Sequence, residues 1–391
     1  MAKKQRNGEG TLCRRKSGKY EYRITYVDEM GGKKRKSFSG ITPDDCYEQA
    51  DAFLYVQNLK NQGVNCDITI PDILKEKYAD DFELNYVSES AYARNLGSLK
   101  RIEKSPIGSV PIMMVTEIQL EAFMKSMTHY SNSEIGKSHQ QLKLAYEIAI
   151  EDGLVGRNLM KTRKLARRPK SSRPDKVVKG LTEEEQLMLI RALELDKVPG
   201  FRNNYKNQLK IELYTGMRMG EINALKHEDI DFSRGIIHVR RTVSRGLNAR
   251  NYLKDSPKTD AGNRDVPINE MAKPVLEDAI MKAPKNRYGL LFYDAKKKDF
   301  IDTQQVNSYF RRLCKKAEIE VRGQHCLRHS FATRCIEAGV PAIVLKTWLG
   351  HTDIHITLDT YADVFNRMNN DAMKKFEDYT SVLNADVNGT I

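Results

Sequence analysis

Side chains suited to phosphodiester chemistry gather in the last quarter of the chain. His325 and Arg328 lie three residues apart and share one face if residues 326–338 form a helix. His351 comes directly after a second, short expected helix, where an imidazole can project into a cleft. Tyr361 follows in a polar segment where a phenol has no obvious role in a core. Imidazole, guanidinium and phenol groups are the proton carriers, cations and nucleophiles that a phosphodiester exchange needs.

The same stretch resembles the C-terminal motif of the tyrosine recombinases, which include integrases of temperate phages and conjugative transposons. That family carries H-x-x-R, then an L-G-H box, then a nucleophilic tyrosine about this far downstream. Upstream, TGMRMGEINAL is similar to the first arginine box of the family, and SPKTDAGNRDVPI to its hairpin lysine box. Any single box has an equally good structural interpretation, whereas four boxes in order from Thr215 to Tyr361 make a specific match.

The resemblance implies how the matching residues would work together on a phosphate. Tyr361 is expected to be the nucleophile, and its ordinary pKa of about 10 means that it needs nearby positive charge to react at neutral pH. Arg218 and Arg328 would each present a planar fork to the phosphate oxygens and stabilise the charge that grows there. His351 would donate a further hydrogen bond to the same phosphate.

Three further residues receive supporting roles from the resemblance. His325 would accept or orient the proton of the tyrosine. Lys258, on the hairpin loop, would act as general acid for the 5′ hydroxyl, although Lys254 lies close by and is an alternative. Glu221, three residues after Arg218, would orient that arginine or a histidine, or serve only the fold.

The expected reaction needs no cofactor and no metal. Two histidine pairs have the spacing of four residues that can hold zinc on a helix, namely His325 with His329 and His351 with His355. Neither pair has the glutamate of an HExxH motif, and Arg328 would lie beside the metal. We therefore expect His329 to pack within its helix and His355 to lie on the surface. No Walker loop or GxGxxG motif lies between a strand and a helix, which fits a reaction without ATP.

A mainly α-helical catalytic domain, residues 181–391, is expected to position these side chains. Helices are expected at residues 183–194, 204–215, 219–226, 270–282, 303–317, 326–338 and 342–349. Strands at 235–242 and 264–268 would flank the loop that carries Lys258. The amphipathic C-terminal piece, 366–383, would cap its own domain or, as the resemblance implies, dock on a neighbouring subunit.

Residues 1–66 predict a small sheet with a helix on one face. Strands are expected at 11–15, 19–27 and 33–38, followed by a helix at 45–60. A two-stranded ribbon can enter a major groove, so the basic face could bind DNA; the alternative is a solvated charged face. The resemblance implies a domain that binds arm-type DNA sites. The basic residues of this face are Arg14, Arg15, Lys19, Arg23, Lys33 and Arg35.

Residues 67–160 read as helical, with helices at 89–101, 117–127 and 133–152. The resemblance implies a core-binding domain that forms half of a clamp around the crossover site. Residues 161–180 form a linker with nine Lys and Arg residues against one Asp. This linker either lies along the duplex, with Arg167 and Arg168 among its DNA contacts, or acts only as a flexible tether.

Composition fits a protein that works on a polyanion. The chain has 391 residues and a net charge of +13, and 40% of its residues are hydrophobic. No apolar run approaches the ~20 residues of a membrane span, and the N-terminus lacks the apolar region of a secretory signal. Six scattered cysteines without a CxxC pair favour free thiols in a reducing compartment. We therefore expect no membrane partner and a cytoplasmic, nucleoid-associated bacterial protein.

Together these features predict a multidomain α+β protein that recombines DNA at specific sites. It would integrate and excise a mobile element through a 3′-phosphotyrosine link and a four-way Holliday junction. Its expected partners are double-stranded DNA, at core and arm-type sites, and three further copies of itself in a homotetramer. The resemblance also implies an excisionase and a DNA-bending host protein. The alternatives are a type IB topoisomerase, which relaxes DNA as a monomer, and a non-catalytic DNA-binding regulator.

Overall fold

A computed structural model gives the fold of the chain. It describes residues 10–28, 30–63, 65–174, 180–197, 204–255, 263–362, 364–365, 373–374, 376–378 and 380–381. The chain divides into two compact units, Met1–Asp175 and Lys176–Ile391. The fold is the expected α+β mixture of helices and small antiparallel sheets. None of the helices in the described ranges has both the length and the apolar character of a bilayer span.

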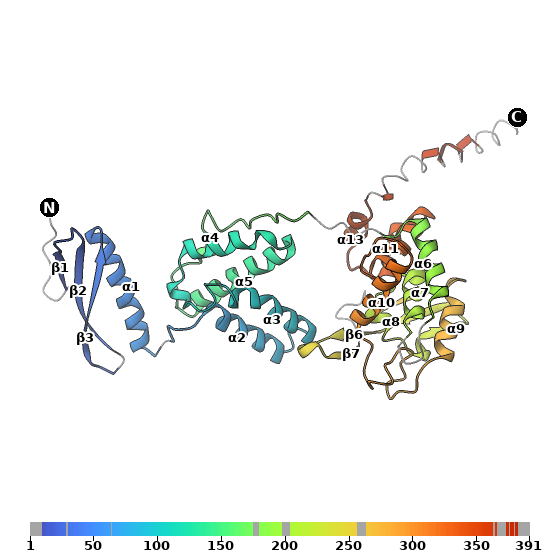
Figure 1. The fold of residues 1–391 in the computed structure, drawn as a ribbon, viewed down its shortest axis with the longest axis horizontal. Helices are drawn as coiled ribbons and strands as arrows, with labels where there is room; N and C mark the ends of the chain where they lie inside the picture. Colours follow the sequence, from blue (N-terminus) through green and yellow to red (C-terminus); the bar gives the residue numbers. More distant parts are fainter. Residues whose placement is uncertain are drawn as a thin grey trace. The chain divides into compact units, whose positions relative to one another are not determined.

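The first unit begins with the expected three-stranded sheet. Its strands β1 (Thr11–Arg14), β2 (Tyr20–Val27) and β3 (Lys33–Gly40) run antiparallel in that order. Tyr22 and Ile24 alternate with polar residues along β2 and, with Phe38, are buried against α1 (Pro43–Asn61). Helix α1 therefore covers one face of the sheet (Figure 1) and leaves the other face free of helices within the described residues.

A helical bundle completes the first unit. It consists of α2 (Ile70–Glu83), α3 (Glu89–Glu103), α4 (Glu117–Ser126) and α5 (Asn132–Glu151). Capping boxes at Thr69, Thr116 and Ser131 begin α2, α4 and α5, because each side chain accepts the N–H three residues on. Short 3₁₀ turns lie at Ile112–Met114, Met127–His129 and Leu159–Lys161.

Much of the expected linker is held on this bundle. Leu165 is buried, and its carbonyl accepts a 2.7 Å hydrogen bond from Nε2 of His139 on α5. The Ser171 hydroxyl donates to the Tyr130 carbonyl over 2.6 Å, and its backbone N–H donates to Asn132 Oδ1 over 2.8 Å. Of the two alternatives for the linker, these contacts fit a flexible tether less well over residues 165–171, because polar groups there find partners on the bundle. Residues 175–179 lie outside the described ranges.

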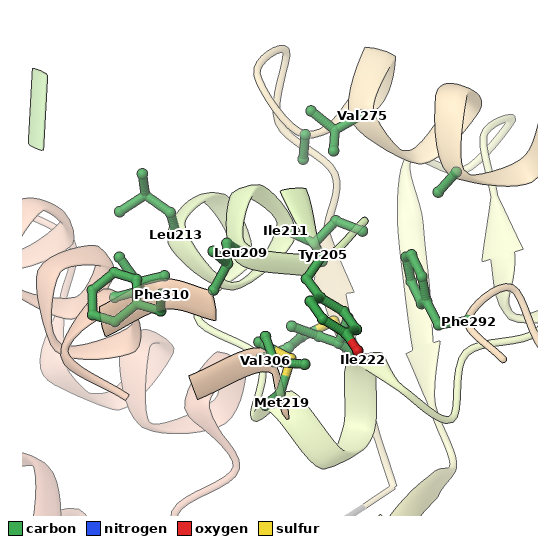
Figure 2. Close-up of a cluster of buried hydrophobic side chains, with 14 of the residues drawn as sticks. Tyr205, Leu209, Ile211, Leu213, Met219, Ile222, Val275, Phe292, Val306 and Phe310 are labelled. Carbon is green, nitrogen blue, oxygen red and sulfur yellow. The ribbon is translucent and has the colours of Figure 1, made fainter. Parts of the chain in front are cut away.

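The second unit is built around helix α7 (Lys206–Thr215). Leu209, Ile211 and Leu213 of α7 belong to one buried cluster with Val275 and Phe310 (Figure 2). Burial of each such side chain stabilises the fold by about 1.5–3 kcal/mol. The other helices of the unit are α6 (Glu183–Leu195), α8 (Met219–Ile222), α9 (Lys273–Met281), α10 (Thr303–Lys316), α11 (Cys326–Glu337), α12 (Ala342–Leu349) and α13 (Ile354–Thr360).

Two small antiparallel sheets accompany these helices. Strands β4 (Ile230–Asp231), β5 (Ile236–Val239) and β8 (Arg264–Pro267) form one, and β6 (Arg241–Arg245) and β7 (Asn251–Asp255) form the other. The single strand expected at 235–242 is therefore divided between two sheets, and β7 was not predicted. The 3₁₀ turns of this unit are His227–Asp229 and Leu247–Ala249.

Helix α8 is shorter than the sequence predicted. The expected helix at 219–226 ends at Ile222 because the following residues bond elsewhere. The amide of Asn223 donates from its side chain to the Ile301 carbonyl, and the Leu225 carbonyl accepts from the Leu291 backbone over 2.8 Å. The side-chain oxygen of Asn223 also accepts from Gln208 of α7 over 3.1 Å, so the end of α8 is bonded to α7.

Candidate active site

Arg328 lies at the centre of the candidate site, on α11. Its side chain is buried, and it donates to the Gly216 carbonyl over 2.7 Å and to the Leu349 carbonyl over 2.6 Å. Gly216 ends α7 in a left-handed conformation (φ +66°), and Leu349 is the last residue of α12. One guanidinium thus joins the ends of two helices. Burial and the positive charge of Arg218 lower the pKa of Arg328 to about 9, partly offset by Glu221.

Arg218 begins α8 and keeps its head at the surface of the site. Its guanidinium donates to Glu221 Oε1 over 3.0 Å and to the Gly350 carbonyl over 3.1 Å. Its backbone N–H donates to Glu221 Oε2 over 2.9 Å. The predicted hydrogen bond between Glu221 and Arg218 is therefore present, and it fixes an arginine whose side chain is 42% exposed.

Arg264 is a buried arginine of the site that the sequence did not point out. Its two terminal nitrogens donate to Glu221 Oε1 and Oε2 over 3.0 and 2.7 Å, and its Nε donates to the Trp348 carbonyl over 2.8 Å. Burial by itself raises the pKa of Glu221, but the hydrogen bonds and charges of Arg264 and Arg218 outweigh it and lower that pKa to about 2. Glu221 is thus a carboxylate that holds two arginines.

His351 follows Gly350, whose left-handed conformation (φ +64°) ends α12. Its Nε2 lies 3.1 Å from a terminal nitrogen of Arg328, which can only donate. Its Nδ1 lies 2.8 Å from the hydroxyl of Thr357, a buried residue of α13. Burial and the nearby charges of Arg328, Arg218 and Arg264 lower the pKa of His351 to about 4. The ring is therefore neutral at pH 7 in the DNA-free chain.

Tyr361 ends α13 and is only 5% exposed. Its ring packs in an apolar cluster with Ile336, Leu345 and Leu349, so the expectation that this phenol lacks a core role was wrong. Its hydroxyl lies 3.0 Å from Nδ1 of His329. Burial raises the pKa of Tyr361 to about 12, although Arg328 acts in the opposite direction.

The histidine next to the Tyr361 hydroxyl is therefore His329, whereas the sequence predicted His325. The two histidines are one helical turn apart on α11, with ring centroids 5.1 Å apart. His325 lies at the beginning of the helix, where its half-exposed ring has Nδ1 4.0 Å from Oε1 of Glu212 on α7. The spacing of four residues was visible in the sequence, but nothing in it told which ring the tyrosine would reach.

The entry of the chain into the second unit is attached to the same helix. The Leu181 backbone N–H donates to the Ser330 hydroxyl over 2.7 Å, and Arg334 donates to the Leu181 carbonyl over 3.0 Å. A Cβ on Gly180 would lie 2.9 Å from the Ser330 backbone nitrogen, so the backbones are in close contact there. Residues 180–181 are thus part of the packing of α11.

Lys258 lies outside the described residues, which resume at Asn263. Lys254, the alternative, is on β7 and pairs with Thr242 of β6. His355 is exposed on α13, as expected. Within the described ranges, no cluster of three or more His, Cys, Asp or Glu side chains is arranged to hold a metal ion.

The basic residues of the N-terminal sheet divide into two groups. Arg15 and Arg23 lie on the face away from α1, and both donate to Glu21, over 2.8 and 3.2 Å. Lys33 and Arg35 are exposed on β3 and, by alternation, belong to the same face. Arg14 is an exception, because it pairs with Tyr20 and its guanidinium lies 5.6 Å from the centre of that ring. Lys19 lies beside the tight turn that joins β1 and β2.

Arg167 and Arg168 are exposed on the stretch that follows the helical bundle. The guanidinium of Arg168 rests over Gly136 of α5, where a Cβ would collide with it. Arg168 is thus held against the bundle, which leaves its charge at the surface.

Comparison with known proteins agrees with this geometry. A tyrosine recombinase XerC-like protein of Caldanaerobacter subterraneus subsp. tengcongensis is 23% identical over 399 residues, covering 93% of this chain and 97% of the relative. A solved structure of the Tn1549 transposon integrase with a circular intermediate DNA is 24% identical, with a TM-score of 0.63 over 75% of this chain and 95% of that one. A lambda integrase tetramer bound to a Holliday junction is 17% identical, with a TM-score of 0.54 over 91% and 96%.

The family match covers the whole candidate site. Residues 179–368 match the model of the phage integrase family, a range that runs from the contact of residue 180 with α11 to beyond Tyr361. It contains Arg218, Glu221, Arg328 and His351 together with Arg264 and His329. Residues 179–368, which hold the candidate site, thus match the phage integrase family.

Proposed function

We propose that this chain is a site-specific tyrosine recombinase, an integrase of a mobile element that cuts and rejoins DNA through Tyr361. One observation carries the proposal: Arg218, Arg328 and His351 converge on the end of α12, and the next helix ends in Tyr361. Three groups that can bind one phosphate therefore lie one short helix away from a nucleophile. A relative named a tyrosine recombinase, over 93% of this chain, and an integrase structure, over 75% of it, support the same activity.

The two arginines would hold the scissile phosphate. In the DNA-free chain their N–H groups donate to the carbonyls of Gly216, Leu349 and Gly350. A phosphate oxygen is a stronger acceptor than a carbonyl, so a phosphodiester can take over part of these bonds. The anion would also raise the pKa of His351, whose Nε2 would then be protonated and donate to the phosphate.

Strand cleavage would begin when the Tyr361 oxygen attacks phosphorus. As the new O–P bond forms, the phenolic proton passes to Nδ1 of His329, which is already 3.0 Å away. Burial and Arg328 lower the pKa of His329, so its ring is neutral at pH 7 and free to accept. The raised pKa of Tyr361 means that this acceptor is needed, because little phenolate forms unaided.

The 5′ oxygen leaves as its bond to phosphorus breaks, and it needs a proton. Lys258 is proposed as the acid, in line with its place in the hairpin box. The energy of the broken bond is kept in the 3′-phosphotyrosine link, so attack by another 5′ hydroxyl reverses every step and rejoins DNA without ATP.

Each subunit would cut one strand, so exchange between two duplexes requires four subunits. We propose a homotetramer and a Holliday junction intermediate, supported by the lambda integrase tetramer that is bound to such a junction. The finer partners are also proposals: arm-type sites for the N-terminal sheet, an excisionase, and a DNA-bending host protein. A polyanionic partner suits the net charge of +13 and favours action on nucleoid DNA in the bacterial cytoplasm.

Covalent trapping tests the proposal directly. The full chain would be mixed with DNA from the ends of the element that encodes it, nicked near the crossover so that the cut strand cannot be rejoined. Denaturing electrophoresis should show a protein–DNA adduct that is absent with Tyr361→Phe. Binding without an adduct at every candidate site would support the non-catalytic regulator instead.

A second assay separates recombination from topoisomerase activity. Two labelled duplexes that carry the sites should exchange strands and give a four-way junction. Relaxation of supercoiled DNA by a single subunit, with no exchange in the presence of two sites, would support the type IB topoisomerase alternative.

A further inference from the structure

A buried carboxyl group lies behind the phosphate-binding residues without an assigned role. Glu212 is on α7, and its side chain is completely buried. Neither carboxyl oxygen has a hydrogen-bond partner within the described residues. A buried carboxyl without a partner costs free energy, so its persistence beside a reactive site calls for a functional explanation.

The groups around Glu212 belong mainly to the candidate site. From α11, Nδ1 of His325 lies 4.0 Å from Oε1, and Arg328 and the Cys326 thiol interact with the carboxyl electrostatically. From α8, Glu221 adds a negative charge. Helices α9 and α10 also pack on α7; Asp278 of α9 accepts from Asn207, and Cys314 of α10 acts on Cys326.

These surroundings favour the neutral, protonated form of the Glu212 carboxyl. Burial, and after it the negative charge of Glu221, raises the pKa of Glu212 well above its ordinary value, against the effect of Arg328. The pKa of His325 is shifted in the opposite direction, because burial and the charges of its neighbours lower it to about 4. Burial thus favours the neutral form of both the carboxyl and the imidazole that it faces.

We propose that Glu212 is a positioning residue that holds a proton for His325 and gives it up when a DNA phosphate enters the site. This inference rests on the proposed recombinase function. The 4.0 Å between Oε1 of Glu212 and Nδ1 of His325 must first shorten to hydrogen-bond distance. The O–H bond of the Glu212 carboxyl then breaks as an N–H bond forms at Nδ1 of His325. A carboxylate and an imidazolium result, with no net uptake of protons.

The phosphate supplies the driving force for this transfer. Its negative charge favours a protonated His325 at the mouth of the site, and the new carboxylate is paired with the imidazolium that it faces. Without Glu212, His325 would have to take its proton from solvent. A protonated His325 adds positive charge beside the phosphate, whereas a neutral one does not. Cleavage would then weaken as the pH rises, whereas the wild-type chain carries this proton with it.

The pH profile of single-turnover cleavage of the nicked substrate tests the inference in the full chain. Glu212→Gln keeps the size and polarity of the side chain but cannot release a proton. Its cleavage rate should match the wild type within about twofold near pH 6 and fall about tenfold below it near pH 8.5. A profile parallel to the wild type over this range would overturn the inference.

A matched control and a double variant make the test specific. Gln208 is also buried on α7, one turn earlier, and bonds to Asn223 instead of the site. Gln208→Leu should change stability and leave the shape of the pH profile unaltered. In a His325→Gln background, Glu212→Gln should have no further effect, and an additive loss there would contradict the inference.

Two further outcomes, a variant that does not fold and a wild type that forms no adduct, can be told apart from a failure of the inference. If Glu212→Gln does not fold, judged by the fluorescence of Trp348, Glu212→Leu replaces it, because a leucine fills the site without burying a polar group. An absence of adduct with the wild type at every pH would refute the recombinase proposal itself. Normal wild-type cleavage with an unshifted Glu212→Gln profile would refute only the role of Glu212.

Discussion

The hydroxyl of Tyr361 lies 3.0 Å from Nδ1 of His329, inside an apolar cluster that leaves the tyrosine 5% exposed. The nucleophile of the DNA-free chain is thus held by a histidine and not by the phosphate-binding arginines.

Removal of this histidine should slow cleavage strongly. For His329→Ala we expect a loss of about 10²- to 10⁴-fold in the rate of adduct formation, the usual contribution of a general base. The exposed His355 offers a matched control, and His355→Ala should cleave at the wild-type rate. Single-turnover trapping on the nicked substrate measures both. Equal rates for the two variants would exclude a role for His329 in proton transfer.

The pair of Glu221 and Arg264 should dominate the stability of the catalytic unit. Glu221→Gln leaves Arg264 buried without the negative charge that faces it and with one acceptor oxygen in place of two, and we expect a loss of about 3 kcal/mol in the free energy of unfolding. Trp348 is the only tryptophan of the chain, and its carbonyl accepts from Arg264. Its fluorescence during urea unfolding therefore reports on this region, and an unchanged midpoint would contradict the prediction.

The same pair predicts how stability depends on pH. The pKa of Glu221 is about 2 in the folded chain, below the ordinary value of 4.5. Its contribution is therefore complete above about pH 5 and is lost as the pH falls towards about 2. Unfolding measured at about pH 7, 4 and 3 should show a steeper acid loss for the wild type than for Glu221→Gln. Parallel curves would mean that this carboxyl is not the group that titrates.

A side chain at Gly216 should destabilise the fold. It has φ +66°, and an added Cβ would lie 2.3 Å from the ring of Phe331. Gly339 has a similar φ of +83° but open space around it, which makes it a matched control for backbone strain alone. We expect Gly339→Ala to cost about 1–2 kcal/mol and Gly216→Ala about 1–3 kcal/mol more. Thermal unfolding compares the two, and equal losses would show that Phe331 moves freely.

The open face of the N-terminal sheet should bind DNA through its unshielded cations. Arg35 is exposed on β3, whereas Arg15 is already bonded to Glu21. Arg35→Ala should weaken binding to arm-type DNA and reduce the slope of log K against log salt by about 1. Arg15→Ala should change that slope less. A gel-shift series over salt concentration measures both, and an unchanged slope for Arg35→Ala would argue for a merely solvated face.

Much of the fold follows from local patterns in the sequence. Helices α4, α5 and α6 begin at capping boxes that Thr116, Ser131 and Thr182 announce, and the alternation around Tyr22 and Ile24 identifies β2. Helix α8 was predicted too long because the residues after it bond to Leu291 and Ile301, 66 and 78 positions away from Leu225 and Asn223. The strand at 235–242 was predicted too long because its two parts pair with different strands, β8 and β7. The local periodicity of the sequence does not predict such partners, so it does not predict where these elements end.

The site was predictable only where each residue type matched its motif. Arg218, Arg328 and His351 could be chosen in this way, and hydrogen bonds gather them at the end of α12. Glu212 and His329 could not, because their importance lies in which groups burial brings against them. Their neighbours come from other helices, and the sequence pattern does not predict that α7 and α11 pack against each other.

Residues 180–181 are attached to α11, the helix that also carries the partner of the Tyr361 hydroxyl. A pull on the chain upstream of Gly180 is first borne by the bonds from Leu181 to Ser330 and Arg334. Ser330 adjoins His329, the partner of the Tyr361 hydroxyl. Residues 180–181 and the Tyr361 hydroxyl are therefore attached to the same turn of α11.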